Sequence, residues 1–209
     1  MNTLKKILLK SHLLRSFLAK RNNLIQIPKK ARLKLNICGK NNRIIIAENV
    51  KISNGILNIF GNNTTIQIGK NTKFDTVTFW LEDDNSQIII GNNCNFCGPV
   101  DISCIESCSI IIGDNLLASR NLSIVNGDSH SIIDCNGNRI NNSSNITIGE
   151  HVWIGKNVNI LKKGSIGSNS IVGANSLITK DFSNYSNVIL AGSPAKIIKN
   201  NVNWDHKRL

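Results

Sequence analysis

An aliphatic residue recurs at every sixth position over the C-terminal part of this chain. The positions are Ile148, Ile154, Ile160, Ile166, Val172 and Ile178. A helix repeats near 3.6 residues and a strand repeats at 2, so a period of six fits neither as a continuous element. It fits a coil with three short flat sides, in which each hexad forms one side and one corner and the aliphatic residues stack inward.

The neighbours of the aliphatic residues complete the pattern. Glycine usually follows, and we expect it to relieve the backbone near each corner. Upstream, similar segments end at Gly69, Gly91, Gly113 and Gly149, with spacings of 22, 22 and 36 residues. The first two spacings predict a coil of 18 residues with four added. The last predicts that a polar loop around His130 replaces part of a coil or bulges out from one.

Charge is unevenly distributed along the 209 residues. Residues 1–47 hold twelve Lys or Arg and no acid, whereas the rest holds thirteen of each sign, so the first segment carries the whole net charge of +12. This asymmetry predicts a local anionic contact, either a membrane surface or an acidic glycan. No nucleic-acid-binding motif is present, and we expect no nucleic-acid partner.

The N-terminal residues show the pattern of a basic amphipathic helix. Residues 1–28 are predicted to form it, as a cap on the open end of the coil or as a contact with a membrane or acceptor. Residues 29–190 are predicted to form the coil, with a loop at about 126–145, and residues 191–209 a last segment and tail. No apolar run is long enough for a signal-peptide core or a membrane span, so we expect a cytoplasmic protein, or one at the inner face of the membrane.

Cysteine and histidine raise the question of a metal. The six cysteines include C-x2-C and C-x3-C spacings, which are typical of zinc sites, but free packing thiols are the favoured interpretation because Cys94 falls at a small-residue position of the repeat. The histidines at 12, 130, 151 and 206 lack a ligand spacing. We therefore predict no metal.

The hexads, together with "GDSHSIID", "EHVWIGKNVNI" and "AGSPAKIIK" in that order, resemble the hexapeptide-repeat acyltransferases. The resemblance implies an all-β fold, a left-handed parallel β-helix of hexapeptide repeats with a short N-terminal α-helix. It also implies that His130, on a loop before the V-W-I-G coil, is the general base that deprotonates an acceptor hydroxyl. His151 remains a competitor or a supporting residue, with a surface or packing role more expected, and Asp128 either orients the His130 ring or caps a turn.

The same resemblance assigns the other site residues. Trp153 would flank the acceptor and the pantetheine arm, and the backbone N–H of Lys156 would stabilise the thioester oxyanion. The residues implied to bind the acyl donor, acetyl-CoA, are Lys156, Ala174, Thr179, Lys180, Lys196 and Lys199. The asparagine that contacts acceptor in the galactoside enzymes has no clear counterpart here, so galactoside specificity does not transfer.

The predicted function is acetyl-CoA-dependent O-acetylation of a sugar hydroxyl. The acceptor is expected to be a bacterial surface glycan, a capsule or O-antigen that includes sialic-acid-containing types, or its precursor. The alternatives are an amino-sugar N-acetyltransferase and a non-catalytic glycan-binding β-solenoid. The resemblance further implies a homotrimer with active sites between subunits.

Overall fold

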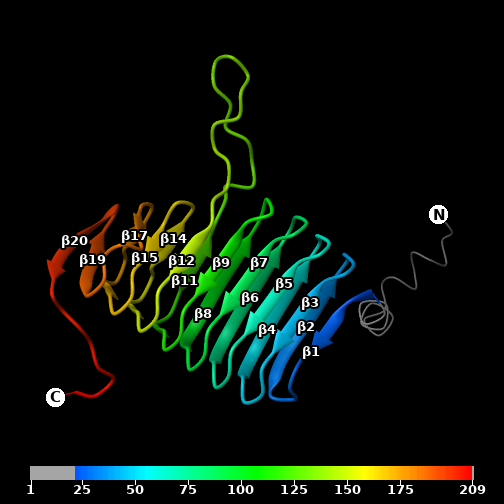
Figure 1. Ribbon diagram of the computed structural model, residues 1–209, viewed down its shortest axis with the longest axis horizontal. Coiled ribbons are helices and arrows are strands. Elements are labelled where there is room, and N and C mark those ends of the chain that lie inside the picture. Colours follow the sequence, from blue (N-terminus) through cyan, green and yellow to red (C-terminus); the bar gives the residue numbers. More distant parts are fainter. Residues whose placement is uncertain (1–21, 209) are drawn as a thin grey trace.

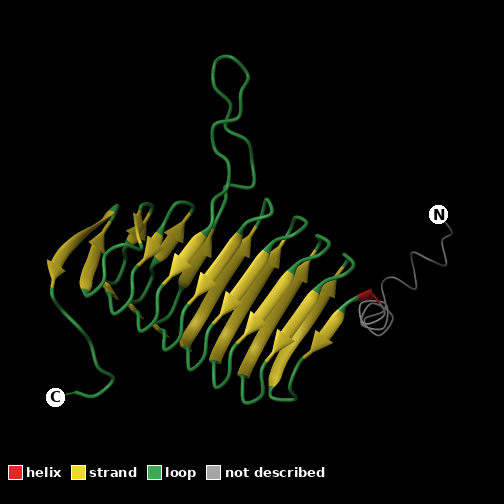
Figure 2. Cartoon of the chain, in the orientation of Figure 1, coloured by secondary structure: helices red, strands yellow, loops and turns green. Residues whose placement is uncertain are grey.

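The six-residue period is realised as short strands that stack one coil upon the next (Figures 1 and 2). The computed structural model describes residues 22–208. Within these residues, two parallel sheets of eight and twelve strands run along a β-solenoid, and only the last strand pair is antiparallel. This architecture confirms the predicted all-β parallel β-helix and is consistent with its left-handed form.

One sheet forms the first face of the solenoid. Its strands are β1 (Leu24–Gln26), β3 (Arg43–Ile46), β5 (Thr65–Ile68), β7 (Gln87–Ile90), β9 (Ser109–Ile112), β12 (Ile146–Ile148), β15 (Ser165–Ile166) and β18 (Asp181–Phe182).

The other sheet divides into two faces towards the C-terminus. The second face holds β10 (Leu117–Ala118), β13 (Trp153–Ile154), β16 (Ile171–Val172), β19 (Val188–Gly192) and β20 (Ala195–Asn200). The third face holds β11 (Leu122–Val125), β14 (Asn159–Leu161) and β17 (Leu177–Ile178). The long strands β2 (Ala31–Ile37), β4 (Lys51–Ile59), β6 (Lys73–Leu81) and β8 (Asn95–Cys104) span both faces. Thus β8 pairs with β10 near its start and with β11 near its end.

Three corners separate the faces. The first corner joins the first and second faces and contains His151, the second joins the second and third faces and contains Asn157, and the third joins the third face back to the first and contains Lys163. All three residues have a positive φ, between 54° and 66°. Each six-residue unit of the C-terminal coils therefore makes one side and one corner, as the period predicts.

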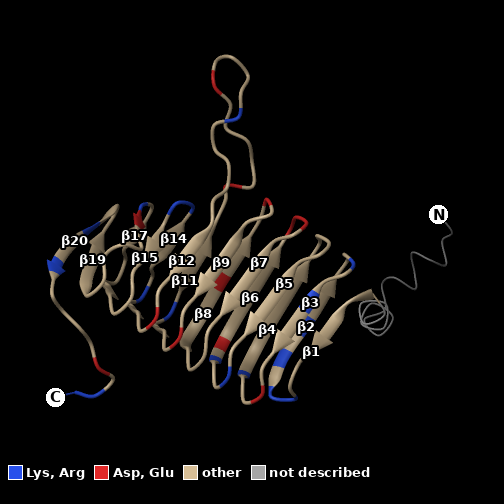
Figure 3. Cartoon of the chain, in the orientation of Figure 1, with Lys and Arg blue, Asp and Glu red and all other residues tan. Residues whose placement is uncertain are grey.

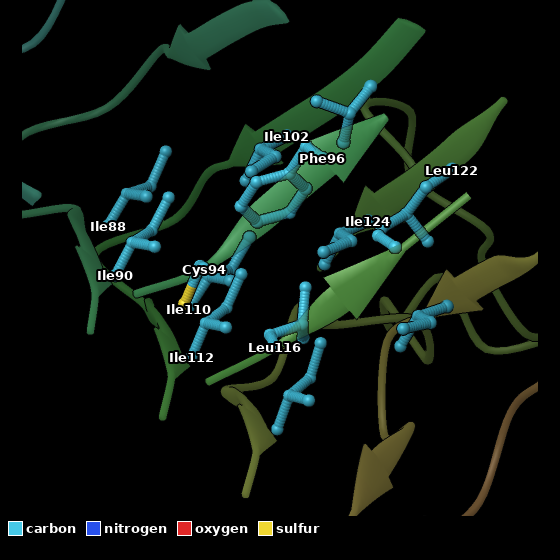
Figure 4. Packing of buried hydrophobic residues seen from close by; sticks show 14 of the residues in the cluster. Ile88, Ile90, Cys94, Phe96, Ile102, Ile110, Ile112, Leu116, Leu122 and Ile124 are labelled. Carbon is cyan, nitrogen blue, oxygen red and sulfur yellow. The ribbon is translucent and has the colours of Figure 1, made fainter. Parts of the chain in front are cut away.

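The step-six aliphatic row forms the core of the C-terminal coils. Its six members, from Ile148 to Ile178, are at most 1% exposed. In the N-terminal coils the interior is filled by the larger side chains of the long strands, and Figure 4 shows Phe96, Ile102 and Ile110 packed together there. Each fully buried aliphatic side chain stabilises the fold by about 1.5–3 kcal/mol relative to exposure, so the stacked row organises the solenoid.

Asparagine makes the corners, and the predicted role of glycine is wrong. The first corner repeats Asn49, Asn71, Asn93, Asn115, His151, Asn169 and Asn187, all with positive φ. Asparagine tolerates this left-handed conformation better than most residues. Gly155 instead lies where a Cβ would come within 2.7 Å of the Ala174 nitrogen, so glycine permits close stacking of coils. Within residues 22–208, only Gly137 and Gly192 are glycines with positive φ.

The two ends differ from the expected boundaries. The predicted amphipathic helix falls on residues 1–21, outside the described part. The solenoid already begins with β1, inside the segment 1–28 that is predicted to form the cap. In residues 22–208 no helix has the length and apolar character needed to cross a bilayer.

The cysteines of the described part are free thiols. Cys94 and Cys104 are buried, and burial raises the pKa of Cys94 to about 11 and that of Cys104 to about 12. Both are therefore protonated at neutral pH and pack as small apolar groups. No group of three metal-ligating side chains gathers among residues 22–208.

Candidate active site

A long loop leaves the solenoid at the third corner and projects away from it (Figure 1). The chain departs after Val125 and returns at Ile146. Asn126 anchors the departure, because its fully buried amide accepts a hydrogen bond from the Ile105 nitrogen at 2.8 Å and donates one to the Ile105 oxygen at 3.1 Å. The loop therefore starts from a fixed point on the coil beneath.

Asn141 ties together the two limbs of the loop near its base. Its side-chain nitrogen donates to the Asp128 carboxylate at 2.8 Å and to the His130 carbonyl at 2.7 Å, and its oxygen accepts from the Ile132 nitrogen at 2.7 Å. Asn141 is only 6% exposed. The backbone of His130 is thus held from the opposite limb of the loop.

Two ion pairs fasten this base to the solenoid. Lys162 on the next coil pairs with Asp128, and its ammonium also donates to the Asn141 carbonyl at 3.1 Å. Arg139 pairs with Glu106, whose carboxylate also accepts from the Ser143 nitrogen at 3.0 Å. No other ion pairs occur within residues 22–208.

These contacts keep both carboxylates ionised. The hydrogen bonds from Lys162 and then Asn141 lower the pKa of Asp128. The hydrogen bond from the Ser143 backbone, followed by that from Arg139, lowers the pKa of Glu106. Asp128 therefore serves to attach the loop, and its carboxylate makes no hydrogen bond to the His130 ring.

His130 presents an unengaged imidazole on this fixed backbone. The residue is exposed, and among residues 22–208 its ring makes no hydrogen bond. A neutral imidazole in that position is free to accept a proton from a bound hydroxyl. The geometry fits the general base that the sequence resemblance assigns to this position.

His151 occupies a structural position instead. It replaces asparagine in the first-corner column, with φ of 54°, and its Nδ1 lies 3.1 Å from the Asn169 Oδ1. Its ring stacks on Trp204 at a centroid distance of 4.4 Å. These contacts give His151 a packing role, which is one of the two roles, surface or packing, that the sequence favours.

Sequence reasoning missed the C-terminal segment, which it treated as a tail. Trp204 is only 9% exposed, and its indole N–H donates to the His151 carbonyl at 2.9 Å. Val202 donates to the Asn187 carbonyl at 3.0 Å, so the segment runs back along the first corner. A large aromatic residue within "NVNWDHKRL" was the available signal.

Trp153 lies at the start of β13 on the second face, next to this segment. Its side chain is 43% exposed, and its ring centroid lies 6.2 Å from that of Trp204. In the sheet it pairs with Leu117 on one side and Ile171 on the other. The indole therefore faces outward, where a ligand can reach it.

Lys156 and Ala174 lie one coil apart at the second corner. Asn175 donates to the Lys156 carbonyl at 2.8 Å, which fixes that peptide. Within residues 22–208 neither the Lys156 N–H nor the Ala174 N–H donates a hydrogen bond. Two fixed amide donors are thus available to a ligand at this corner, which is what an oxyanion site requires.

The other predicted donor-binding residues lie at two places. Thr179 and Lys180 form the third corner between β17 and β18. Lys196 and Lys199 are exposed on β20, where they pair with Ala191 and Ile189 of the neighbouring strand β19.

The single chain therefore divides the predicted site into two groups. His130, Thr179 and Lys180 belong to the third corner. The residues on the second face or second corner are Trp153, Lys156, Ala174, Lys196 and Lys199. One chain does not bring these two groups together.

Comparison with known proteins identifies the class. Residues 145–180 match the family model described as bacterial transferase hexapeptide (six repeats). The polySia-specific acetyltransferase NeuO is 30% identical, with a TM-score of 0.73 over 88% of this chain and 78% of that chain. The polysialic acid O-acetyltransferase OatWY is also 30% identical, with a TM-score of 0.64 over 84% of this chain and 92% of that chain.

A more distant structure shares the fold alone. A mutant of AntD, an N-acyltransferase from Bacillus cereus, is 18% identical with a TM-score of 0.52, over 79% of this chain and 85% of that chain. No curated protein sequence matches the chain. The family-model match and the two polysialic acid acetyltransferase structures identify the protein as an acyltransferase. The chain belongs to the family of hexapeptide-repeat sugar O-acetyltransferases.

Proposed function

We propose that this protein transfers an acetyl group from acetyl-CoA to a hydroxyl of a sialic-acid-containing bacterial surface glycan, a capsule or O-antigen, or its precursor. The observation that supports the proposal most is the exposed His130 ring on its fixed loop, in a chain that resembles two polysialic acid acetyltransferases over most of its length, one of them named as an O-acetyltransferase. A sugar hydroxyl is a weak acid, so it needs a base to accept its proton as it attacks the thioester, and an imidazole ring without a hydrogen-bond partner can do so.

The reaction follows from the groups in place. The imidazole of His130 accepts the hydroxyl proton while the hydroxyl oxygen attacks the thioester carbonyl carbon. The carbonyl oxygen becomes an oxyanion and accepts a hydrogen bond from the backbone N–H of Lys156. When the tetrahedral intermediate collapses, the carbon–sulfur bond breaks and the imidazolium returns its proton to the departing thiolate. The products are the acetyl ester and free CoA.

The remaining predicted residues carry groups that are suited to binding acetyl-CoA as the acyl donor. The Ala174 N–H is available to an amide of the pantetheine arm, and Thr179 offers a hydroxyl. Lys180, Lys196 and Lys199 are exposed ammonium groups that suit the CoA phosphates.

A homotrimer would complete the site. The third corner of one chain and the second face of another would then lie together, uniting the two groups of residues. The projecting loop supports this assembly, because Ile132, Ile133 and Ile140 are 55%, 63% and 63% exposed in the single chain. Apolar side chains of this size gain by burial against a neighbour. A cytoplasmic location, where acetyl-CoA is made, follows from the same proposal.

An acceptor screen tests the function. The full chain is incubated with acetyl-labelled acetyl-CoA and polysialic acid, sialic acid oligomers, a galactoside or glucosamine, with His130→Ala as the control. We expect label in the sialic acid acceptors and its release by mild base, which cleaves an ester and spares an amide. Base-stable label in glucosamine would replace the proposal with N-acetylation, and no label in any acceptor would refute it.

A further inference from the structure

A single column of outward-facing residues runs along the solenoid and ends at Trp153. The sheet pairings place the five residues from Lys51 to Trp153 in register on the second face, one from each coil. Lys30 comes directly before β2, and its carbonyl accepts a hydrogen bond from the Ile52 nitrogen at 3.2 Å, so it extends the column by one coil. From the N-terminal end the column is Lys30, Lys51, Lys73, Asn95, Leu117 and Trp153. Neighbouring strands lie about 4.8 Å apart, so five steps place Lys30 roughly 24 Å from Trp153.

The first three members of this column form a cationic ladder, defined here as Lys30, Lys51 and Lys73. All three are exposed. None forms an ion pair with a residue in the range 22–208, although Glu48 and Asp75 lie nearby in the sequence. Figure 3 shows basic residues on β2 and at the lower edge of the N-terminal coils, with acidic residues interspersed. Within the described part of the chain, therefore, no ion pair neutralises the charges of the ladder.

A polar groove accompanies the ladder. It has a volume of about 570 Å³ and is lined by the three lysines together with Asn71, Asn93 and His206. The asparagines belong to the first-corner column, and Asn71 donates to Asn93 at 3.2 Å. His206 comes from the C-terminal segment that Trp204 holds against the first corner. The groove thus has cations along one side and fixed amides along the other.

This arrangement suits a linear acceptor more than a small one. A single sugar carboxylate can contact one ammonium group, whereas a chain that follows the groove contacts the three in succession. Exposed charge contacts are individually weak, and a line of them acts additively on a polymer that carries a charge on every unit. The hydroxyls of the same polymer match the amide side of the groove.

We propose that the cationic ladder and its groove bind an extended polyanionic glycan and lead it towards Trp153. The proposal rests on the function proposed above and adds the place where the acceptor chain lies outside the reacting unit. The ladder makes the protein selective for chain length, because only a long acceptor reaches from Trp153 back to Lys73, Lys51 and Lys30.

Binding without acetyl-CoA separates this proposal from the chemistry. Fluorescently labelled long polysialic acid and a sialic acid dimer are titrated into the full chain, and affinity is followed by anisotropy at two ionic strengths. The test variant is Lys51→Gln with Lys73→Gln. The matched control is Lys34→Gln with Lys40→Gln, which removes the same charge from exposed residues outside the column and groove.

The expected result has three parts. The test variant binds the long chain about tenfold more weakly, as two lost charge contacts allow, and the control changes affinity less than twofold. The dimer binds the test variant and the wild type equally. Added salt weakens the wild type more steeply than the test variant, since exposed charges are screened.

Other outcomes would overturn the proposal. They are equal weakening in the test and control variants, equal effects on dimer and polymer, or failure of the wild-type chain to bind the polymer. Circular dichroism confirms that each variant is folded before titration. If the polymer binds as expected but receives no acetyl group, the proposed function fails and the binding site stands.

Discussion

Trp204 stacks on His151 and donates its indole N–H to the carbonyl of the same residue, at 2.9 Å. The two residues are 53 positions apart in the chain. Through this pair a segment outside the repeat is attached to the first corner beside Trp153. The C-terminal residues are therefore part of the folded unit, and removing the indole has a predictable cost.

We expect Trp204→Ala to lower the free energy of unfolding by about 3–5 kcal/mol, the usual loss for a buried aromatic side chain. Urea denaturation followed by circular dichroism measures it. Trp204→Phe keeps an aromatic ring that can stack on His151 and loses the hydrogen bond and part of the packed surface, so it should recover much of the difference. Equal stability of Trp204→Ala and the wild type would show that the segment is not attached in solution.

The site could be predicted from sequence only in part. The His130 loop and the V-W-I-G coil have fixed order and spacing, which the resemblance uses. The Trp204 contact has no such spacing, because it joins a segment outside the repeat to a corner within it. Asn141 and Lys162 were missed for the same reason, since their partners across the loop depend on the path of an irregular segment.

Substitutions of His130 and His151 should have very different effects on kcat. We expect His130→Asn to lower kcat at least a hundredfold, the low end for loss of a general base, without changing the KM for acetyl-CoA. His151→Asn should leave kcat within about threefold, because asparagine fills the neighbouring first-corner positions with the same φ. Steady-state kinetics of the two variants decide the assignment. The reverse order of effects would make His151 the base.

Lys162 should act through the position of the loop. We expect Lys162→Met to lower kcat roughly tenfold, because His130 loses a support of its backbone while its ring stays intact. Lys163→Met is the matched control, since Lys163 is exposed and forms no ion pair within residues 22–208. It should keep wild-type turnover.

The pH dependence distinguishes positioning from acid–base chemistry. Lys162 lowers the pKa of Asp128 from its ordinary value of 3.8, so the stabilisation is present above that value and is lost as pH falls through the lower folded-state pKa. Without Lys162 the pKa returns towards its ordinary value, and Asp128 stays ionised above about pH 5. The loss in kcat should therefore be the same at every pH above about 5. A loss that varies across that range would contradict a positioning role.

The step-six row should tolerate no charge. We expect Ile166→Asp to prevent folding, because Ile166 is fully buried between Ile148 and Phe182 on adjacent strands and a carboxylate there has no partner. Ile111→Asp is the control, since Ile111 lies on the same face but is 40% exposed. Soluble yield and thermal melting compare them. A native melting curve for Ile166→Asp would remove this row from the core.

The period predicted the buried row because burial follows directly from which side chains recur. It did not predict why glycine follows the row, since a short residue can serve a turn or a close contact. The positions of the first corner could have been predicted, however, because Asn49, Asn71, Asn93 and Asn115 recur every 22 residues. The lengths of strands β4, β6 and β8 could not be predicted, because a 22-residue spacing does not show where in the coil the four added residues lie.

The glycine that follows an aliphatic residue should therefore resist substitution for reasons of space. A Cβ on Gly155 would lie 2.7 Å from the Ala174 nitrogen and 2.9 Å from the Val172 oxygen. Both atoms are backbone, so the coils must separate to admit it. We expect Gly155→Ala to lower the free energy of unfolding by about 1–3 kcal/mol, as overpacking does, measured by urea denaturation.

Gly137, in the projecting loop, provides the opposite case. It has a φ of 83°, and a Cβ there would meet nothing within 4 Å. Gly137→Ala thus introduces backbone strain without a clash, in a loop held at its base by Asn141 and the two ion pairs. We expect its cost to be about 1–2 kcal/mol and confined to the loop, with the urea midpoint unchanged. If Gly137→Ala lowered the urea midpoint more than Gly155→Ala, the close stacking of the coils at Gly155 would not be the tighter constraint on glycine in this protein.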